Sequence, residues 1–139
     1  MSSDRRGLAS DRRRPALIVS ANPDIVDLYV LSLRSERTPA LSVTEVDEAL
    51  HLLRDRAVSA VVIDVANPAA DWSACTRMME AAETNLPIIV LTGWIDPQAR
   101  EKAFSLGCAA FIAKPASPEC LGDILKRTRA GERGIVVME

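Results

Sequence analysis

The sequence contains few of the residues that mark a metal site, a disulfide framework or a membrane segment. It has one histidine and three cysteines in 139 residues, and the cysteines (Cys75, Cys108 and Cys120) are widely spaced. An odd and scattered set of this kind suggests neither disulfides nor a zinc site, so we interpret the cysteines as buried small apolar residues. The longest apolar runs, such as residues 88–91, are far shorter than a membrane helix requires.

A strong charge of either sign is also missing. The chain has 17 Lys+Arg against 19 Asp+Glu, a formal net charge of -2, which argues against nucleic-acid binding by the whole domain. The arginine-rich start lacks the apolar segment of a signal peptide, so we expect a cytoplasmic protein that does not associate with membranes. With 48% hydrophobic and 26% charged residues, the composition is typical of one soluble globular domain.

The first 14 residues differ from the rest of the chain. They carry five arginines and almost no apolar side chain, so they cannot bury enough surface to offset the cost of ordering. We predict a disordered basic tail. A DNA-associated role for this tail is a weaker alternative, because no aromatic residue lies among the arginines to stack on bases.

From residue 16 onward, short apolar runs alternate with amphipathic stretches, a pattern typical of βα units around a parallel sheet. Most of the runs are continuously apolar, as strands covered on both faces are, whereas the second alternates and is expected near an edge. Strands are predicted at residues 16–19, 41–46, 60–63, 88–91 and 110–113. The domain is predicted to span residues 15–130, followed by a C-terminal tail at 131–139.

Three helices have starts that can be read directly. In each, a side chain able to cap the helix precedes a proline, which suits the first helical position. The pairs are Asn22-Pro23, Asp96-Pro97 and Ser117-Pro118. At the other end, Gly107 and Gly131 follow periodic stretches, as helix-ending glycines do.

Polar side chains follow three of the predicted strands, namely Asp64, Thr92 and Lys114. The carboxyl ends of parallel strands lie at one edge of the sheet, where ligands bind in folds of this kind. A carboxylate can accept a phosphoryl group, an ammonium can orient its oxygens, and a hydroxyl can donate to one of them. From spacing alone, ordinary polar strand ends with a structural Lys114–Asp64 pair are an equally good interpretation.

Residues 16–130 resemble the receiver domain of bacterial response regulators, which take a phosphoryl group from a histidine kinase onto an aspartate. Residues 64–68 are similar to the acceptor segment, Thr92-Gly93 to the switch hydroxyl and the small residue after it, and residues 111–115 to the fifth strand with its aromatic residue, lysine and proline. The resemblance implies an α/β flavodoxin-like fold with a five-stranded parallel sheet of order 2-1-3-4-5 and five helices.

The resemblance also implies roles for individual residues. Asp64 would be the phosphoacceptor, and Thr92 and Lys114 would contact the phosphoryl group. Phe111 matches the switch aromatic residue but lacks a hydroxyl, and the bond before Pro115 is expected to be cis. Trp94 occupies a position that borders the phosphorylation pocket in the family.

One departure from the family affects the metal. Typical receivers end the first strand in two acidic residues that bind Mg²⁺, but this chain has Ser20 and Ala21. A hard cation needs oxygen ligands, usually carboxylates, so we expect an impaired metal site and no resident cofactor. Without the acidic pair, a Lys114–Asp64 pair would hold the pocket in one state without metal or phosphate.

Other enzyme classes fit less well. A phosphatase of the haloacid-dehalogenase type needs a second acid two residues after its nucleophile, and Ala66 stands there. No glycine-rich loop follows any strand, which excludes the common nucleotide-binding motifs. His51 has no metal-ligand partner at a suitable spacing and is interpreted as a surface residue.

The leading hypothesis is therefore a stand-alone, degenerate receiver that is not an enzyme and acts by docking on partners. The competing hypothesis is a working phosphoacceptor modified at Asp64. The expected partners are a histidine kinase or another signalling protein. The resemblance also implies a homodimer through a face formed by residues 98–104, 110–113 and 119–129. An ordinary solvated face with charge pairs four residues apart is an equally good interpretation of these helices.

Overall fold

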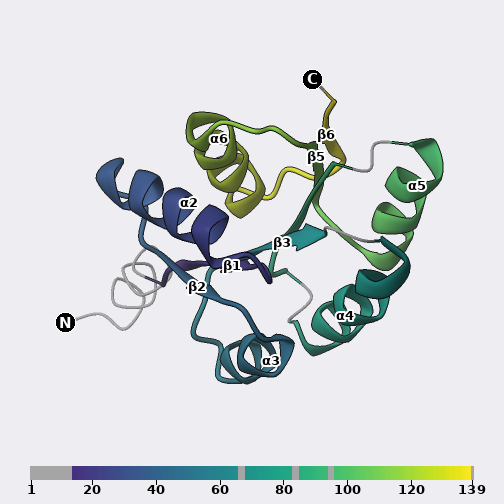
Figure 1. Ribbon diagram of the computed structural model, residues 1–139, viewed down its shortest axis with the longest axis horizontal. Coiled ribbons are helices and arrows are strands. Elements are labelled where there is room, and N and C mark those ends of the chain that lie inside the picture. The colour runs from purple at the N-terminus through teal and green to yellow at the C-terminus, as the bar shows by residue number, and fades with distance from the viewer. Residues whose placement is uncertain (1–13, 66–67, 83–84, 94–95, 139) are drawn as a thin grey trace.

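The protein forms one parallel sheet between two layers of helices (Figure 1). The computed structural model describes residues 14–138 except 66–67, 83–84 and 94–95. The predictions for the N-terminal tail, apart from Arg14, and for Ala66 and Trp94 therefore lie outside the described residues. None of the helices in the described part is long and apolar enough to cross a membrane.

Strands and helices alternate along the whole described chain. The strands are β1 (Ala16–Val19), β2 (Ala40–Val43), β3 (Ala60–Val65), β4 (Ile88–Thr92), β5 (Ala110–Ala113) and β6 (Ile135–Val137). The helices are α2 (Pro23–Ser35), α3 (Val46–Arg54), α4 (Pro68–Ala81), α5 (Pro97–Leu106) and α6 (Pro118–Arg129).

The sheet has the predicted class and order, with one strand added. All strand pairs are parallel and the order is β2-β1-β3-β4-β5-β6, which confirms the predicted 2-1-3-4-5 arrangement. The sixth strand lies in the segment predicted as a C-terminal tail. It pairs with β5 because Ile135 fits the sheet opposite Ala110 and is itself buried in the core.

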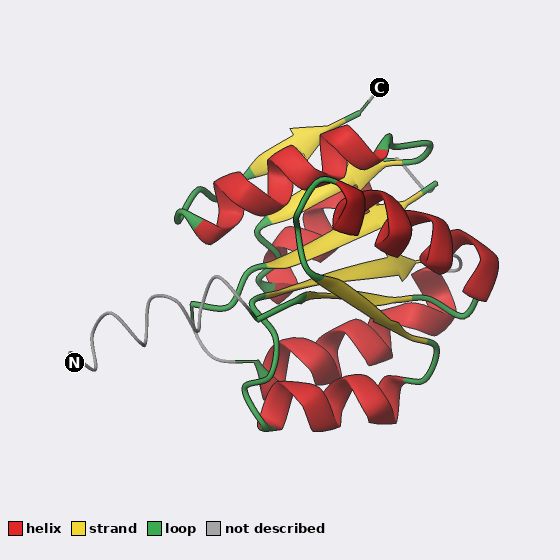
Figure 2. Ribbon diagram, turned by 90° about the vertical axis from the view of Figure 1, so that its left-hand side faces the viewer, coloured by secondary structure: helices red, strands yellow, loops and turns green. Residues whose placement is uncertain are grey.

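Alternating residues of β1 to β5 supply two separate cores. Helices lie on both sides of the sheet (Figure 2). In β1, Leu17 and Val19 face α3, α4 and α5, whereas Ala16 and Ile18 face α2 and α6. The same alternation continues through β3, β4 and β5. Both faces are thus covered by helices, which explains why these strands are apolar throughout rather than in every second position.

The predicted helix starts are confirmed. The side chains of Asn22, Asp96 and Ser117 each accept a hydrogen bond from a backbone N–H of the first turn, and a proline follows each of them. Gly107 ends α5 in the left-handed conformation with φ +108°, which a glycine adopts at little cost.

Four strand boundaries differ from the prediction: both ends of β2, the end of β3, and the end of β4, which includes Thr92. The second strand ends at Val43, and Val46 instead begins α3, because Val46 packs against the core from the helix. The third strand continues to Val65, since its last two residues remain in register with Leu91 and Thr92 of β4. As a result, Asp64 is held inside a paired strand rather than in the loop after it.

Candidate functional site

Asp64 lies at the carboxyl end of β3, and its carboxylate is almost completely enclosed. The Asp64 side chain is 5% exposed. The Ser20 hydroxyl donates a hydrogen bond of 2.6 Å to Oδ2, and the Lys114 ammonium forms an ion pair with Oδ1. Both oxygens of the carboxylate are therefore engaged by side chains from the ends of β1 and β5.

Ser20 links this carboxylate to the start of α2. The residue follows β1 and is buried, and its Oγ accepts a hydrogen bond of 3.1 Å from the backbone N–H of Asn22 while donating to Asp64. Asn22 in turn caps α2 through its side chain, which accepts from the N–H of Asp24. One hydroxyl thus connects the helix cap with the centre of the site.

Lys114 is positioned by the neighbouring strand ends. Its backbone N–H donates to the carbonyl of Thr92 at 2.8 Å, which continues the pairing of β4 and β5 by one residue. The Lys114 side chain is 26% exposed, so water reaches the ion pair from one side. The bond between Lys114 and Pro115 is cis, as predicted.

Thr92 lies at the same edge of the sheet, but its hydroxyl does not point at the carboxylate. Thr92 is buried, and its Oγ1 donates a hydrogen bond of 2.7 Å to the carbonyl of Val65, the residue after Asp64. The structure therefore places the three predicted strand-end residues together. In this state the threonine holds the backbone of the acceptor strand.

Tyr29 is a neighbour of the site that the sequence analysis did not identify. Its hydroxyl donates to the carbonyl of Ala116 at 2.7 Å. Burial raises the pKa of the Tyr29 phenol, and the negative charge of Asp64 raises it further. In the sequence, Tyr29 could be recognised only as one of the apolar positions of α2, where its ring indeed packs in the core.

The remaining predicted residues have ordinary surroundings. Phe111 is fully buried in the core on the α3, α4 and α5 side, so the candidate switch residue is in its inward position. His51 is exposed on α3 and lies 3.3 Å from Asp55, which confirms the surface interpretation. Cys75 and Cys108 are buried as expected, while Cys120 is partly exposed.

A cleft of about 260 Å³ opens beside Asp64 and is bordered by Ser20 and Ala21. Asp64 is the one carboxylate among the described residues that line it. Ala21 offers no side-chain ligand, Ser20 donates its proton to Asp64, and an ammonium occupies the other carboxylate oxygen. This donor set does not suit Mg²⁺, which prefers several oxygen ligands including carboxylates. In the described part of the chain, no group of three histidine, cysteine or acidic residues is placed to hold a metal.

Comparison with known proteins gives a consistent assignment. Residues 16–126 match the family model of the response regulator receiver domain. The response regulator GtcR of Aneurinibacillus migulanus is 28% identical over 102 residues, which cover 73% of this chain and 42% of that protein. The chain therefore spans less than half the length of that regulator.

Solved structures show the same fold. A CheY-like receiver domain protein from Methanospirillum hungatei superposes with a TM-score of 0.74 at 19% identity, covering 84% of this chain and 94% of that one. The receiver domain of a sensor histidine kinase from Pseudomonas aeruginosa, solved with magnesium coordinated in its active-site cleft, gives a TM-score of 0.71 at 27% identity. That match covers 85% of this chain and 98% of the other.

Proposed function

The chain belongs to the response regulator receiver domain family, and from this premise we propose that it signals by protein contact with its acceptor site held in one state. The proposed role is regulatory rather than enzymatic, and its proposed location is the cytoplasm. The observation that carries the proposal is the closed group of Ser20, Asp64 and Lys114. Both oxygens of the Asp64 carboxylate are already engaged by side chains of the same chain, one by a hydrogen bond and the other by an ion pair.

The closed group works against phosphorylation in two ways. An Asp64 oxygen must be free to attack phosphorus, but one oxygen accepts from Ser20 and the other is paired with Lys114. The charge that develops during transfer also needs compensation. A metal that clamps the phosphoryl group supplies several kcal/mol of that stabilisation, so its loss lowers the rate by about three powers of ten.

A working phosphoacceptor is the second candidate, and one observation favours it. Asp64, Thr92 and Lys114 still lie together at the carboxyl edge of the sheet. The Lys114 side chain is long and partly exposed, so its ammonium could move from the carboxylate to an arriving phosphoryl oxygen. This alternative predicts modification of Asp64 itself.

Labelling with a small phosphodonor distinguishes the two candidates. The protein is incubated with acetyl phosphate and millimolar Mg²⁺, and the intact mass is measured beside an Asp64→Asn control. We expect little or no added phosphoryl group on the wild type. Substantial labelling that disappears in Asp64→Asn would contradict the closed-site proposal and support the phosphoacceptor.

Rebuilding the acidic pair gives a complementary test. Ser20→Asp with Ala21→Asp places carboxylates at the mouth of the cleft and removes the hydroxyl that donates to Asp64. We expect Mg²⁺ affinity to rise clearly in calorimetric titration, and stability without metal to fall because like charges crowd together. Unchanged Mg²⁺ binding would show that these positions do not cooperate with Asp64.

The proposed partners are a histidine kinase, another signalling protein, or a second copy of this chain. In the sequence-based expectation, the dimer face includes residues 98–104, 110–113 and 119–129. The structure changes what that face presents, because β6 pairs along the edge of β5 and leaves Val136 40% exposed. A second copy would therefore meet α5, α6 and β6 instead of the bare edge of β5.

A further inference from the structure

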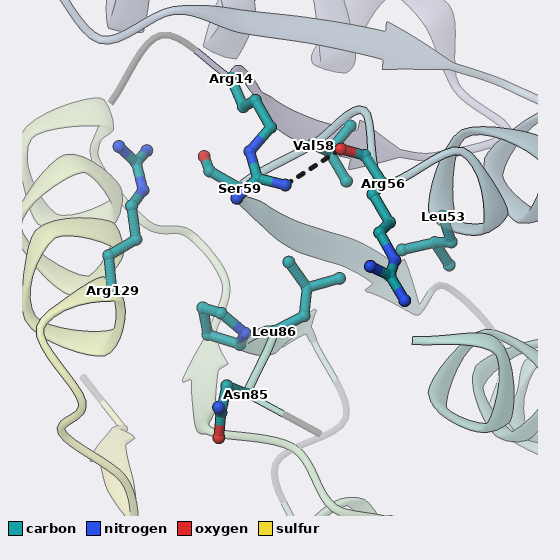
Figure 3. A pocket seen from close by; sticks show the side chains of 9 residues that line it. Arg14, Leu53, Arg56, Val58, Ser59, Asn85, Leu86 and Arg129 are labelled. Carbon is teal, nitrogen blue, oxygen red and sulfur yellow. Dashed lines mark hydrogen bonds between the residues drawn. The ribbon is translucent and has the colours of Figure 1, made fainter. Parts of the chain in front are cut away.

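A second cavity, of about 300 Å³, lies at the amino-terminal ends of the strands (Figure 3). The candidate site lies at their carboxyl ends, on the opposite side of the molecule. The second cavity opens where β1, β3 and β4 begin and where α3 and α6 end. Arg14, Arg56 and Arg129 line it from three different segments, together with Ser59. None of the described residues that line this cavity is acidic.

Arg129 is the most informative residue of the cavity. It is the last residue of α6, and its Nε and Nη2 atoms are buried with no hydrogen-bond partner in the described part of the chain. Burial lowers the pKa of this guanidinium. Buried donors that lack an acceptor are costly and uncommon, so a charged side chain in this position needs an explanation.

The helix dipole alone does not explain why Arg129 is buried. Cations near a helix C-terminus are favourable, and α6 carries Lys126, Arg127 and Arg129 in its last turn, but this interaction does not require the guanidinium to enter a cavity. Arg127 satisfies its guanidinium outside the cavity by binding Glu132 and Asp123. Arg129 instead extends from α6 into the cavity, toward Ser59 and Arg14 (Figure 3).

The Ser59 hydroxyl is another hydrogen-bond donor at this cavity without an acceptor among the described residues. The residue directly precedes β3, and its backbone N–H donates to the carbonyl of Pro15 at 2.9 Å. Its hydroxyl is buried and has no hydrogen-bond partner among the described residues. The hydroxyl and the Arg129 guanidinium therefore face the same cavity, and each has hydrogen-bond donors for which the described residues offer no acceptor.

The other two arginines are held in place by the backbone. Nη1 of Arg14 donates to the carbonyl of Arg56 at 3.0 Å, a bond that joins the segment before β1 to the turn after α3. Arg56 has φ +55°, a left-handed conformation that few non-glycine residues adopt. The hydrogen bond holds the Arg14 guanidinium at the cavity, and the Arg56 side chain also borders it.

Apolar side chains complete the wall. Leu53, Val58, Leu86 and Pro87 border the cavity beside the arginines. A bare inorganic ion would leave this surface exposed to water. A ligand with both an anionic group and an apolar body would satisfy the donors and cover the wall, and the volume is at the small end of ligand pockets.

From these observations we propose that the cavity binds a small organic phosphate, with its phosphoryl group on Arg129 and Ser59 and its apolar body against Leu86 and Pro87. Guanidinium groups bind phosphate through paired N–H donors, and a doubly charged phosphate pairs with a guanidinium more strongly than a singly charged carboxylate does. The site is independent of Asp64 and of the function proposed above.

Thermal unfolding at constant ionic strength tests the proposal with three probes: inorganic phosphate, phenyl phosphate and benzoate. We expect phenyl phosphate to raise the Tm of the full chain by a few degrees at about ten times its Kd. Inorganic phosphate should bind about fivefold or more weakly because it cannot cover the apolar wall. Benzoate should be weaker than phenyl phosphate because it carries one charge.

Variants assign the effect to the cavity. Arg129→Gln should lower the affinity for phenyl phosphate at least tenfold or so, and should raise the Tm of the unliganded protein by removing a buried charge without a partner. Ser59→Ala should weaken binding by about threefold. Arg100→Gln removes the same charge from α5, outside the cavity lining, and should bind as the wild type does.

Spectroscopy of the wild type locates the ligand even where a variant fails to fold. In ¹⁵N–¹H spectra, phenyl phosphate should shift the amide of Ser59 and the side-chain Nε–H signal of Arg129. Shifts centred on Lys114 and Asp64 instead would overturn the proposal, because the anion would then occupy the receiver site. An unchanged Tm with all three probes, or equal binding to Arg129→Gln, would overturn it as well.

Discussion

The ion pair at the candidate site makes a quantitative prediction for Lys114→Met. Methionine keeps most of the length and apolar character of the lysine stem but removes the ammonium that pairs with Asp64. The carboxylate is 5% exposed and would keep the Ser20 hydroxyl as its remaining side-chain partner among the described residues. The variant therefore leaves a nearly buried negative charge without compensation.

The magnitude follows from the burial of the two partners. Removing one member of a fully buried pair costs about 3–5 kcal/mol of stability. Lys114 is 26% exposed, so solvent screens part of the interaction, and we expect a loss of about 2–3 kcal/mol. Asp64→Asn should cost less, about 1 kcal/mol, because Ser20 can still donate to the amide oxygen and the lysine can extend into water.

Urea unfolding monitored by circular dichroism measures these losses. With a denaturant slope of about 1–3 kcal/mol per molar, Lys114→Met should lower the midpoint by about 1 M or more. In the Asp64→Asn background the same substitution should cost less than about 0.5 kcal/mol, which gives a coupling of about 2 kcal/mol between the two residues.

Lys126→Met provides the matched control, because it removes an exposed lysine from α6. Its effect should stay within about 0.5 kcal/mol. If Lys114→Met cost as little as Lys126→Met, or cost the same with and without the Asp64 carboxylate, the site would not be held closed by this pair. The Lys114–Asp64 pair would then not oppose phosphorylation of Asp64.

Three further predictions follow from other parts of the molecule. Tyr29→Phe should lower the free energy of unfolding by about 1 kcal/mol, since it removes the hydrogen bond to the carbonyl of Ala116. The wild type should lose stability above about pH 10, because a phenol with a raised pKa stabilises the fold only while it is protonated, and Tyr29→Phe should reduce this loss. A thiol reagent at pH 8, followed by peptide mass spectrometry, should label Cys120 first, because Cys108 is buried and its pKa is raised to about 12 by burial and by Cys75. Reversing the charges of Arg100 and Lys126 by substitution with Glu should weaken self-association measured by analytical ultracentrifugation, most visibly at low salt. A wild type that sediments as a monomer at high concentration would contradict the proposed dimer.

Much of the fold could be predicted because its signals are local. Continuous apolar runs identify strands that are covered on both faces, and a capping side chain followed by proline marks the starts of α2, α5 and α6 independently of the rest of the chain. The juxtaposition of Asp64, Thr92 and Lys114 also follows from the sequence, since parallel strands with right-handed crossovers bring their carboxyl ends to one edge. These features need no knowledge of side-chain orientation.

The parts that escaped prediction depend on tertiary packing. Residues 135–137 are too short a run to indicate a strand, and β6 exists because the edge of β5 offers unpaired backbone groups and a place for Ile135 in the core. The direction of the Thr92 hydroxyl depends on the nearby carbonyl of Val65. The cavity that contains Arg129 combines side chains from segments far apart in the chain, so no local motif indicates it.

The absence of carboxylates at positions 20 and 21 and the closed group of Ser20, Asp64 and Lys114 are linked by electrostatics. Two further carboxylates beside Asp64 would leave a net negative charge at the site even with Lys114 in place, and a divalent cation would be the natural way to neutralise it. With Ser20 and Ala21 at these positions, one carboxylate faces one ammonium, and the serine supplies a proton donor instead of a third negative charge. The charges of Asp64 and Lys114 therefore balance within the chain. Phosphorylation of Asp64 would have to break this pair, so the coupling energy between Lys114 and Asp64 would be one contribution to its free-energy cost.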